Sequence, residues 1–292
     1  MHDVIVIGGS YSGLAAALQL VRGRRRVLLI DAGLRRNRNA AHSHGFLGQD
    51  GQDPAAIAAK GRAEVLAYPT ASLVEATAES IARTDGGFVV QVTGGERHEA
   101  KLLILALGVV DELPDIPGVG ERWGRSIFHC PYCHGYELGG GRIGVLATGP
   151  LSVHHAMLLP DWGETTYFTR GIEPTAEERV VLARRGVTLE ATEVVAVEEH
   201  ATVRLADGRA LPFTGLFLMP RSRVAGGLVA SLGLETEEGP AGPILKTDAM
   251  KATSVPGVFA CGDAALLAGS VSFAVADGAR AGIGAHRALI FS

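Results

Sequence analysis

The chain opens with an almost unbroken apolar run that ends in glycines. Residues 2–7 are rich in β-branched side chains and predict a short buried strand. After a turn at residues 8–13, residues 14–21 show helical periodicity with good helix formers, and residues 27–30 form a second apolar run that ends at Asp31. Both runs are apolar on both faces, as buried strands of a parallel sheet require, so the pattern predicts a βαβ unit.

The rest of the chain continues this rhythm, with two interruptions rich in proline and glycine. These interruptions, at residues 113–118 and 238–243, predict domain boundaries. We therefore expect an α/β fold of two Rossmann-like three-layer domains, in which residues 1–113 and 244–292 form one domain and residues 118–240 an inserted one. Strands are expected at residues 88–92, 102–106, 142–146, 165–168, 187–189, 194–199, 202–206 and 258–260, and helices at residues 152–159, 176–185 and 273–289.

Composition and charge exclude several classes of protein. The 292 residues include 27 Lys and Arg against 31 Asp and Glu, and the resulting charge of −4 argues against a dedicated nucleic-acid binder. With 47 % apolar residues, disorder driven by composition is excluded. The longest apolar run, residues 102–110, is far shorter than the ~20 residues that span a bilayer. The chain begins without a signal-peptide pattern, so we expect a cytoplasmic protein with no membrane partner.

A glycine motif lies between the first strand and the first helix. Gly8-x-Ser10-x-x-Gly13 lets backbone N–H groups approach a pyrophosphate at the helix N-terminus, and Asp31, about 20 residues on, would accept from a ribose hydroxyl. Ser10 replaces the usual middle glycine and is expected to push the pyrophosphate slightly away. The motif predicts dinucleotide binding, and the alternative is a tight turn that serves packing only.

Two of the three cysteines have the spacing of a redox pair. Three cysteines cannot form a disulfide framework, whereas Cys130 and Cys133 can close a small disulfide ring and exchange it with a second thiol. His134 follows directly and is placed to take or give a thiol proton, while His129 has less reason to face the pair. The alternative is a zinc half-site, but zinc needs four ligands and no second cysteine pair exists, so we predict no metal.

Motifs near the C-terminus extend the pattern over nearly the whole chain. Cys261-Gly262-Asp263 follows the last predicted strand, and Ala106-Leu107-Gly108 follows an earlier one. Together with the glycine motif and the cysteine pair, these segments resemble the thioredoxin-reductase-like members of the pyridine nucleotide–disulfide oxidoreductases. The resemblance implies that the split domain binds FAD and that Asp263 holds the ribityl–phosphate portion of the flavin.

The segment around the cysteines narrows the resemblance. Residues 130–137 read Cys-Pro-Tyr-Cys-His-Gly-Tyr-Glu, whereas thioredoxin reductases that use NADPH typically have Ala-Thr between the cysteines and Asp after them. The segment is similar to that of the flavin-dependent dithiol oxidases that close disulfides in gliotoxin, holomycin and romidepsin. By the division of labour in that family, Cys133 would be the flavin-proximal thiol and Cys130 the one that exchanges with substrate.

The inserted domain lacks most of the glycines and arginines that would bind the phosphates of NADPH. The turn after its first strand, residues 147–150, contains one glycine, and after the next strand only Arg170 is present, with Glu173 nearby. A 2′-phosphate is recognised best by clustered arginines, which bind it through paired hydrogen bonds. We therefore expect a Rossmann-like domain that has lost its nicotinamide cofactor.

The resemblance, together with these residues, implies an FAD-dependent dithiol–disulfide oxidoreductase that oxidises a small dithiol to a disulfide, with oxygen as acceptor and hydrogen peroxide as product. The alternatives are a thioredoxin-type disulfide reductase fed by NADPH or another donor, and an FAD-binding redox sensor. The expected partners are a small dithiol or disulfide or a thioredoxin-like protein, and the resemblance implies a homodimer. The expected catalytic residues are Cys130, Cys133 and His134, and the expected FAD-binding residues are Gly8, Ser10, Tyr11, Ser12, Gly13, Asp31, Arg36, Asn37, His44, Gly108, Gly262, Asp263, Ser270 and Val271.

Overall fold

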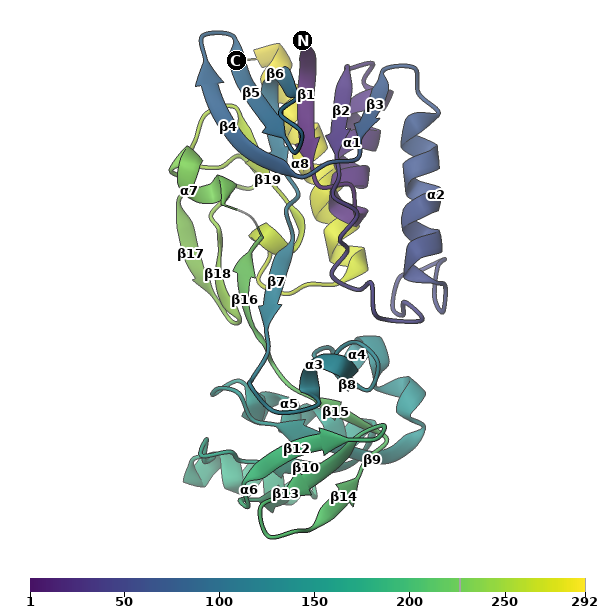
Figure 1. Ribbon diagram of the computed structural model, residues 1–292, viewed down its shortest axis with the longest axis vertical. Helices are drawn as coiled ribbons and strands as arrows, with labels where there is room; N and C mark the ends of the chain where they lie inside the picture. The colour runs from purple at the N-terminus through teal and green to yellow at the C-terminus, as the bar shows by residue number, and fades with distance from the viewer. Residues whose placement is uncertain (226, 292) are drawn as a thin grey trace. The chain divides into compact units, whose positions relative to one another are not determined.

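The computed structural model describes residues 1–225 and 227–291. The chain divides into two compact units (Figure 1). The first unit contains Met1–Arg38, Phe46–Val110 and the described residues from Ser222 onward, and the second contains Asn39–Gly45 and Asp111–Arg221. None of the described helices is long and apolar enough to cross a membrane.

A seven-stranded sheet forms the middle of the first unit. Its strands run in the order β3-β2-β1-β6-β5-β4, with β19 also paired to β6. The strands β3, β2, β1, β6 and β19 run parallel to one another. Strand β5 is antiparallel to β6, and β4 is antiparallel to β5. The strands are β1 (His2–Ile7), β2 (Val27–Ile30), β3 (Ala71–Val74), β4 (Ala78–Thr84), β5 (Gly87–Val92), β6 (Arg97–Leu105) and β19 (Val258–Ala260).

Both faces of this sheet are buried, because alternate residues of each strand enter different cores. Val4 and Val6 of β1 pack with α1 (Tyr11–Arg22) and α8 (Val271–Phe291) on one face. Ile5 and Ile7 belong to the core of the other face, which includes β4, β5 and α7 (Leu228–Leu232). Alternation of side chains along a strand, with a period of two, explains why every position of β1 after Asp3 is apolar.

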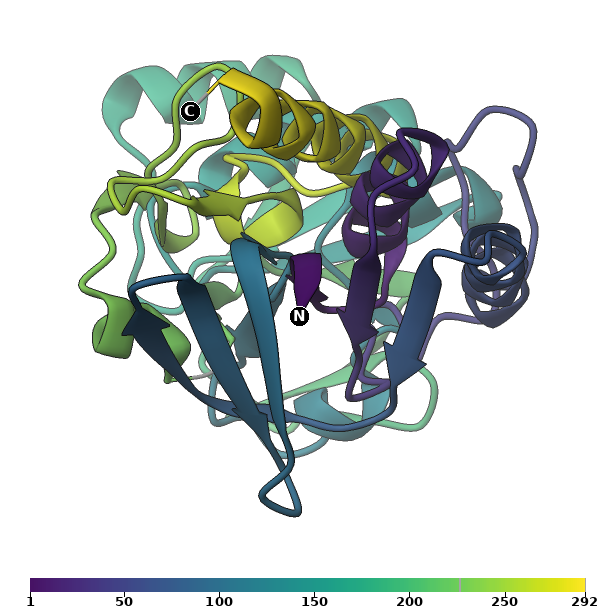
Figure 2. The same ribbon diagram turned by 90° about the horizontal axis from the view of Figure 1, so that it is seen from above.

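The backbones of α1 and α8 touch. Figure 2 shows the two helices side by side over the sheet. A Cβ at Gly278 of α8 would overlap the carbonyl oxygen of Ser12, and one at Gly282 would overlap that of Ala16. Only glycine permits this approach, because any side chain at these positions would require the helices to separate.

Smaller elements complete the first unit and its connections. The chain leaves it through β7 (Val109–Glu112) and returns through β16 (Arg221–Val224), which pair with each other. Beyond β16 come the hairpin of β17 (Thr236–Gly239) and β18 (Gly242–Leu245) and the short helix η3 (Gly262–Ala265). A further helix, α2 (Pro54–Leu66), follows the loop after β2.

The return to the first unit lies earlier than the expected boundary at residues 240–244. It falls between Arg221 and Ser222. The glycine- and proline-rich residues 238–243 form the β17–β18 turn, in which Gly239 pairs with Gly242. Such residues mark tight turns as well as domain borders, so their composition alone misplaced the crossover.

The second unit has a five-stranded parallel sheet in the order β11-β10-β9-β15-β8. One core lies between this sheet and a three-stranded antiparallel sheet, and another lies between it and α5 and α6, so this unit is also layered. Its strands are β8 (Ile127–Phe128), β9 (Gly140–Leu146), β10 (Gly163–Phe168), β11 (Thr188–Glu190), β12 (Val194–Glu198), β13 (Thr202–Leu205), β14 (Ala210–Pro212) and β15 (Gly215–Phe217). Its helices are α3 (Val119–Arg122), α4 (Pro131–His134), η1 (Tyr136–Leu138), α5 (Ser152–Leu158), η2 (Leu159–Asp161) and α6 (Ala176–Arg184).

The predicted α/β architecture is confirmed, and the strongest omission is α2. This helix is rich in alanine, so its apolar positions form no clear stripe. Its start does carry a sequence signal, because Asp53 accepts a hydrogen bond from the N–H of Ala55 at 2.6 Å and Pro54 occupies the first turn.

The contact of α1 with α8 leads to a stability prediction. We expect Gly278→Ala to destabilise the first unit by about 2 kcal/mol, as overpacking of a filled core does, and to lower its melting temperature by roughly 4–8 °C. Gly61→Ala in α2 is the control, because its Cβ would meet only the side chain of Leu14, at 3.4 Å. Calorimetry that finds equal melting temperatures for Gly278→Ala and the wild type would contradict the packing argument.

Candidate functional site

The turn between β1 and α1 is the first part of the site. Gly8 has a φ of +107°, and a Cβ there would overlap the main-chain oxygen of Ala106. A Cβ at Gly13 would overlap the carbonyl oxygen of Gly8. Ser10 precedes α1 as its N-cap, and its side chain makes no capping hydrogen bond. The first amides of α1 therefore have no side-chain cap, which suits a phosphate group at this turn.

Asp31 at the end of β2 is held by three donors. Its Oδ1 accepts from the N–H groups of Gly9 at 3.1 Å and Gly33 at 3.2 Å. Its Oδ2 accepts from Nη2 of Arg62 at 2.7 Å. A carboxylate has about four acceptor positions, so one remains for the predicted ribose hydroxyl. Arg62 lies on α2, and the sequence reasoning missed it together with that helix.

The loop after β2 brings four predicted residues into contact. Arg36 donates to Asp263 at 2.9 Å, which joins this loop to η3. Asn37 donates from its side-chain amide to the hydroxyl of Tyr11 at 3.1 Å. The neighbouring Arg35 has a buried Nε without a hydrogen-bond partner. A buried guanidinium N–H that lacks an acceptor fits a place for an anionic oxygen, so Arg35 joins the candidate phosphate ligands.

Ser12 faces the protein interior. It is 7 % exposed, and a Cβ at Gly262 would overlap its hydroxyl. The hydroxyl also interacts with the thiol of Cys261, whose pKa is raised to about 12 because the thiol is fully buried. Ser12 was predicted to bind the flavin, but this orientation leaves only its main chain for that purpose.

The remaining predicted residues are distributed over both units. Gly108 has a φ of +66°, and its carbonyl oxygen accepts from the N–H of Ala225 at 3.2 Å. Ser270 precedes α8 and accepts from the N–H of Phe273 at 3.1 Å, so it caps the helix that begins at Val271. His44 belongs to the second unit, and its contact with the flavin stays a prediction.

The cysteine pair lies at the start of α4 in the second unit. Cys130 is the N-cap of this helix and is disulfide-bonded to Cys133, with a Cα–Cα distance of 5.3 Å. The helix packs closely on Trp162, because a Cβ at Gly135 would come within 2.7 Å of that indole ring and of the carbonyl oxygen of Pro131. Only glycine fits there, so Gly135 and Trp162 hold the disulfide segment against the unit.

His134 follows Cys133 directly at the end of α4 and packs on an aromatic ring. Its ring stacks on Phe128 with ring centroids 4.2 Å apart. Burial and, to a smaller extent, the nearby His44 together lower the pKa of His134 to about 4. His44 in turn pairs with Glu137, with Nδ1 and Oε1 3.4 Å apart. The imidazole of His134 is therefore neutral near pH 7, and its lowered pKa makes it a weaker base than an ordinary histidine. His129 instead lies against Trp123, with ring centroids 6.1 Å apart.

The turn after β9 is closed by its own side chains. The hydroxyl of Ser152 accepts from the N–H groups of Thr148 at 3.0 Å and Gly149 at 3.3 Å. Arg170 donates from Nη1 to the carbonyl oxygen of Ala147 at 2.7 Å. These amides and this arginine occupy the sequence positions that would bind a pyrophosphate and a 2′-phosphate, and their hydrogen bonds are used internally.

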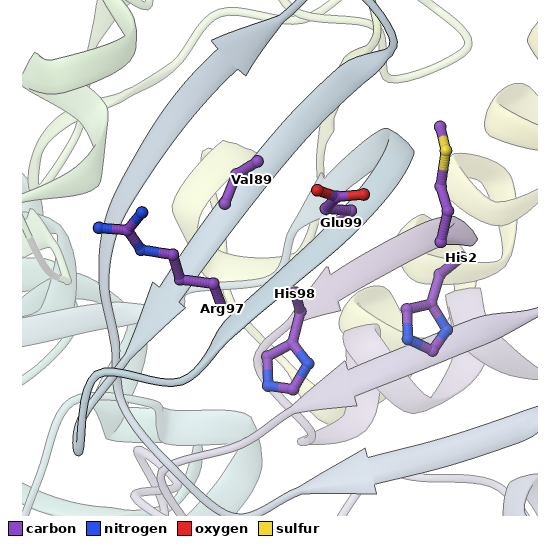
Figure 3. A pocket seen from close by; sticks show the side chains of 6 residues that line it. His2, Val89, Arg97, His98 and Glu99 are labelled. Atoms are coloured by element: carbon purple, nitrogen blue, oxygen red, sulfur yellow. The ribbon is translucent and has the colours of Figure 1, made fainter.

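A shallow hollow on the first unit is separate from these features (Figure 3). His2 lies at the amino end of β1, whereas Gly8 follows the carboxyl end of the same strand. Ligands of open α/β sheets bind at the carboxyl ends, so the hollow is not the dinucleotide site. The hollow is lined by Met1, His2, Val89, Arg97, His98 and Glu99.

In the described part of the chain, no three His, Cys, Asp or Glu side chains are placed to hold a metal ion.

A dinucleotide-type turn in one unit and a disulfide at a helix start in the other define a disulfide oxidoreductase. The model of the pyridine nucleotide-disulphide oxidoreductase family matches residues 2–281. The chain belongs to this flavin-dependent family, and it is an oxidoreductase of the thioredoxin-reductase-like type. The family resemblance and the enzyme class predicted from the sequence are confirmed.

Individual relatives match along nearly their whole length. The chain is 34 % identical to thioredoxin reductase tcpT of Claviceps purpurea (strain 20.1), over 96 % of this chain and 92 % of that protein. An oxidoreductase from Agrobacterium tumefaciens has a crystal structure with a TM-score of 0.97 and 54 % identity, and the match covers 99 % of both chains. The crystal structure of HlmI has a TM-score of 0.91 and 39 % identity, over 99 % of this chain and 92 % of that one.

The environment of His134 leads to a pH prediction. We expect the pKa of its imidazole to lie near 4 in the folded protein, against an ordinary value of 6.5. The unfolded state then binds more protons between these values, so the stability that His134 contributes is present above about pH 6.5 and is lost as the pH falls toward 4. NMR titration of the ring signals measures the pKa directly.

His134→Gln identifies the ring signals of His134 and serves as the control. This variant should lose less stability than the wild type between pH 6.5 and pH 4. A folded-state pKa near 6.5, or an identical loss of stability in both proteins, would contradict the burial argument.

Proposed function

We propose that this chain is an FAD-dependent dithiol oxidase, which converts a small dithiol to a disulfide with oxygen as the electron acceptor and hydrogen peroxide as the product. The observation that carries the proposal is the closed turn after β9, in which Ser152 takes the amides of Thr148 and Gly149. A turn with its amides occupied is a poor pyrophosphate site, which argues against NADPH as the electron source. The similarity to the dithiol oxidases in residues 130–137 supports the same conclusion.

The first unit has residues that suit FAD. The turn between Gly8 and Gly13 would hold the pyrophosphate, with Arg35 and Arg36 as charged donors and Asp263 for the ribityl–phosphate portion. The unpartnered Nε of Arg35 supports this assignment, because a phosphate oxygen would satisfy it. FAD bound there would supply two-electron redox chemistry, accepting electrons from the reduced cysteine pair and delivering them to oxygen.

The cysteine pair would carry out the exchange with substrate in two balanced steps. A substrate thiolate attacks Sγ of Cys130, the Cys130–Cys133 bond breaks, and Cys133 leaves as a thiolate. The second substrate thiol then attacks the mixed disulfide at its substrate sulfur, which releases the oxidised substrate and Cys130. The substrate loses two electrons and two protons, and the cysteine pair gains the electrons. His134 is the proton acceptor that the sequence predicts for this exchange, and its lowered pKa makes it a weak base.

A disulfide reductase is the second candidate. Relatives at 34 % and 32 % identity carry the name thioredoxin reductase. In this alternative the same exchange runs in reverse on a thioredoxin-like protein or a small disulfide, with electrons from NADPH or another donor. Cytoplasmic location and assembly as a homodimer stay predictions from the sequence and its resemblance.

Anaerobic reduction distinguishes the two candidates. We expect an excess of a small dithiol to bleach the visible absorbance of the bound flavin, and NADPH to leave it unchanged. Hydrogen peroxide should form in an amount equal to the dithiol oxidised when air is admitted. Rapid bleaching by NADPH would contradict our interpretation of the turn after β9, and a flavin that dithiol does not reduce would exclude the oxidase.

Cysteine variants test the order of the exchange. We expect Cys133→Ser to accumulate a mixed disulfide on Cys130 when mixed with a linear small disulfide, because the displaced half diffuses away and the resolving thiol is missing. Cys130→Ser should form no such adduct, and neither variant should show flavin reduction by dithiol. Mass spectrometry of the intact chain measures the adduct, and its formation on Cys133 alone would reverse the assigned roles.

In His134→Ala, an unchanged single-turnover rate of flavin reduction would contradict the role in proton transfer.

A further inference from the structure

A buried ion pair lies beneath η3 in the first unit. Nζ of Lys251 and Oδ2 of Asp277 are 3.2 Å apart, and both side chains are 7 % exposed. Lys251 precedes β19 in a tight turn with a φ of +69°, and Asp277 lies on α8 directly before Gly278. Neither residue has a role in the exchange of thiols described above.

The pair ties both ends of η3. Oδ2 of Asp277 accepts from the N–H of Gly262 at 3.0 Å. Nζ of Lys251 donates to the carbonyl oxygen of Ala265 at 3.1 Å. Gly262 and Ala265 are the first and last residues of η3, and Asp263 lies between them. The pair thus holds both ends of the short helix that carries Asp263.

The position of Asp277 is itself set by packing. Gly278, the next residue, contacts the main chain of Ser12 so closely that a Cβ would overlap it. This contact determines the depth of α8 against α1, which carries the phosphate-binding turn at its start. Through Asp277, η3 is therefore attached to α8, and α8 packs on α1, the helix that begins at the phosphate-binding turn.

Stability alone does not account for such a pair. Removing two charges from water is costly, and replacing a buried pair by apolar residues of similar volume is often neutral or stabilising. What an apolar pair cannot do is accept from the N–H of Gly262 and donate to the oxygen of Ala265. The directional hydrogen bonds at η3 are the property that the pair supplies.

We propose that Lys251 and Asp277 are positioning residues for the cofactor, which orient η3 so that Asp263 is placed to hold the flavin. This inference rests on FAD binding in the proposed function, and it adds two residues that the thiol exchange does not use. Its expected consequence is a change in the affinity for FAD without a matching change in the stability of the apoprotein.

The test compares two double variants that remove the buried charges. K251M/D277L removes every hydrogen bond of the pair, and K251M/D277N keeps an acceptor for the N–H of Gly262. After the flavin has been removed with chaotropic salt, FAD is titrated back and its fluorescence reports binding. We expect the dissociation constant to rise about tenfold or more in K251M/D277L and about threefold in K251M/D277N, as loss of main-chain hydrogen bonds predicts.

A surface pair of the same kind is the matched control. Lys246 and Glu235 are 3.0 Å apart and more than half exposed, so K246M/E235L should leave the dissociation constant unchanged. The melting temperature of each apoprotein is measured alongside. A fall in melting temperature with an unchanged dissociation constant in K251M/D277L would assign the pair to stability alone and overturn the proposal. If K251M/D277L does not fold, K251M/D277N is judged by the same criterion.

A double-mutant cycle tests whether the pair acts through Asp263. Asp263→Asn should weaken FAD binding by itself, and its combination with K251M/D277N should cost less than the two effects added. Full additivity would overturn the assignment. Binding of FAD by the wild-type apoprotein, measured in the same titration, tests the cofactor part of the proposed function. Oxidation of dithiols does not enter this comparison, so failure of the oxidase and failure of the positioning role are distinguishable.

Discussion

The first unit depends on the close approach of main chains around the start of α1. Gly8 and Gly13 bring the turn against Ala106 and close it on itself, and Gly278 brings α8 onto Ser12. No side chain separates these segments, so the turn, the helix and η3 form one rigid arrangement. The charged groups that suit a cofactor are attached to this arrangement, because Arg36 reaches Asp263 from the loop after β2.

The two units share a βαβ rhythm but use their turns differently. In the turn after β1, the side chain of the N-cap serine makes no capping hydrogen bond. In the turn after β9, two main-chain N–H groups donate to the hydroxyl of Ser152. This difference separates a turn that suits a phosphate from one that closes on itself. The second unit contributes the disulfide instead, on a short helix held by Gly135 against Trp162. His134, at the end of the same helix, is neutral near pH 7 because burial lowers its pKa.

Much of the candidate site was predictable because its signals are local. The glycine turn, the Cys130–Cys133 pair and the α/β class each follow from residues close in sequence. Other features were missed because their signals are weak or distant. The helix α2 has no clear apolar stripe, and Arg62 was missed with it. The pair of Lys251 and Asp277 joins residues 26 positions apart, and nothing in either neighbourhood predicts the partner.

The sequence by itself determined the fold class, the phosphate-type turn and the redox pair, because short-range pattern and turn chemistry govern these. Tertiary structure decided which way individual side chains point. Ser12 turned toward Cys261, His44 joined the second unit, and the crossover fell at Ser222 while residues 238–243 became a hairpin turn. The physical reason is that burial and ion pairing depend on neighbours that are distant in the chain, and only the packed structure selects those neighbours.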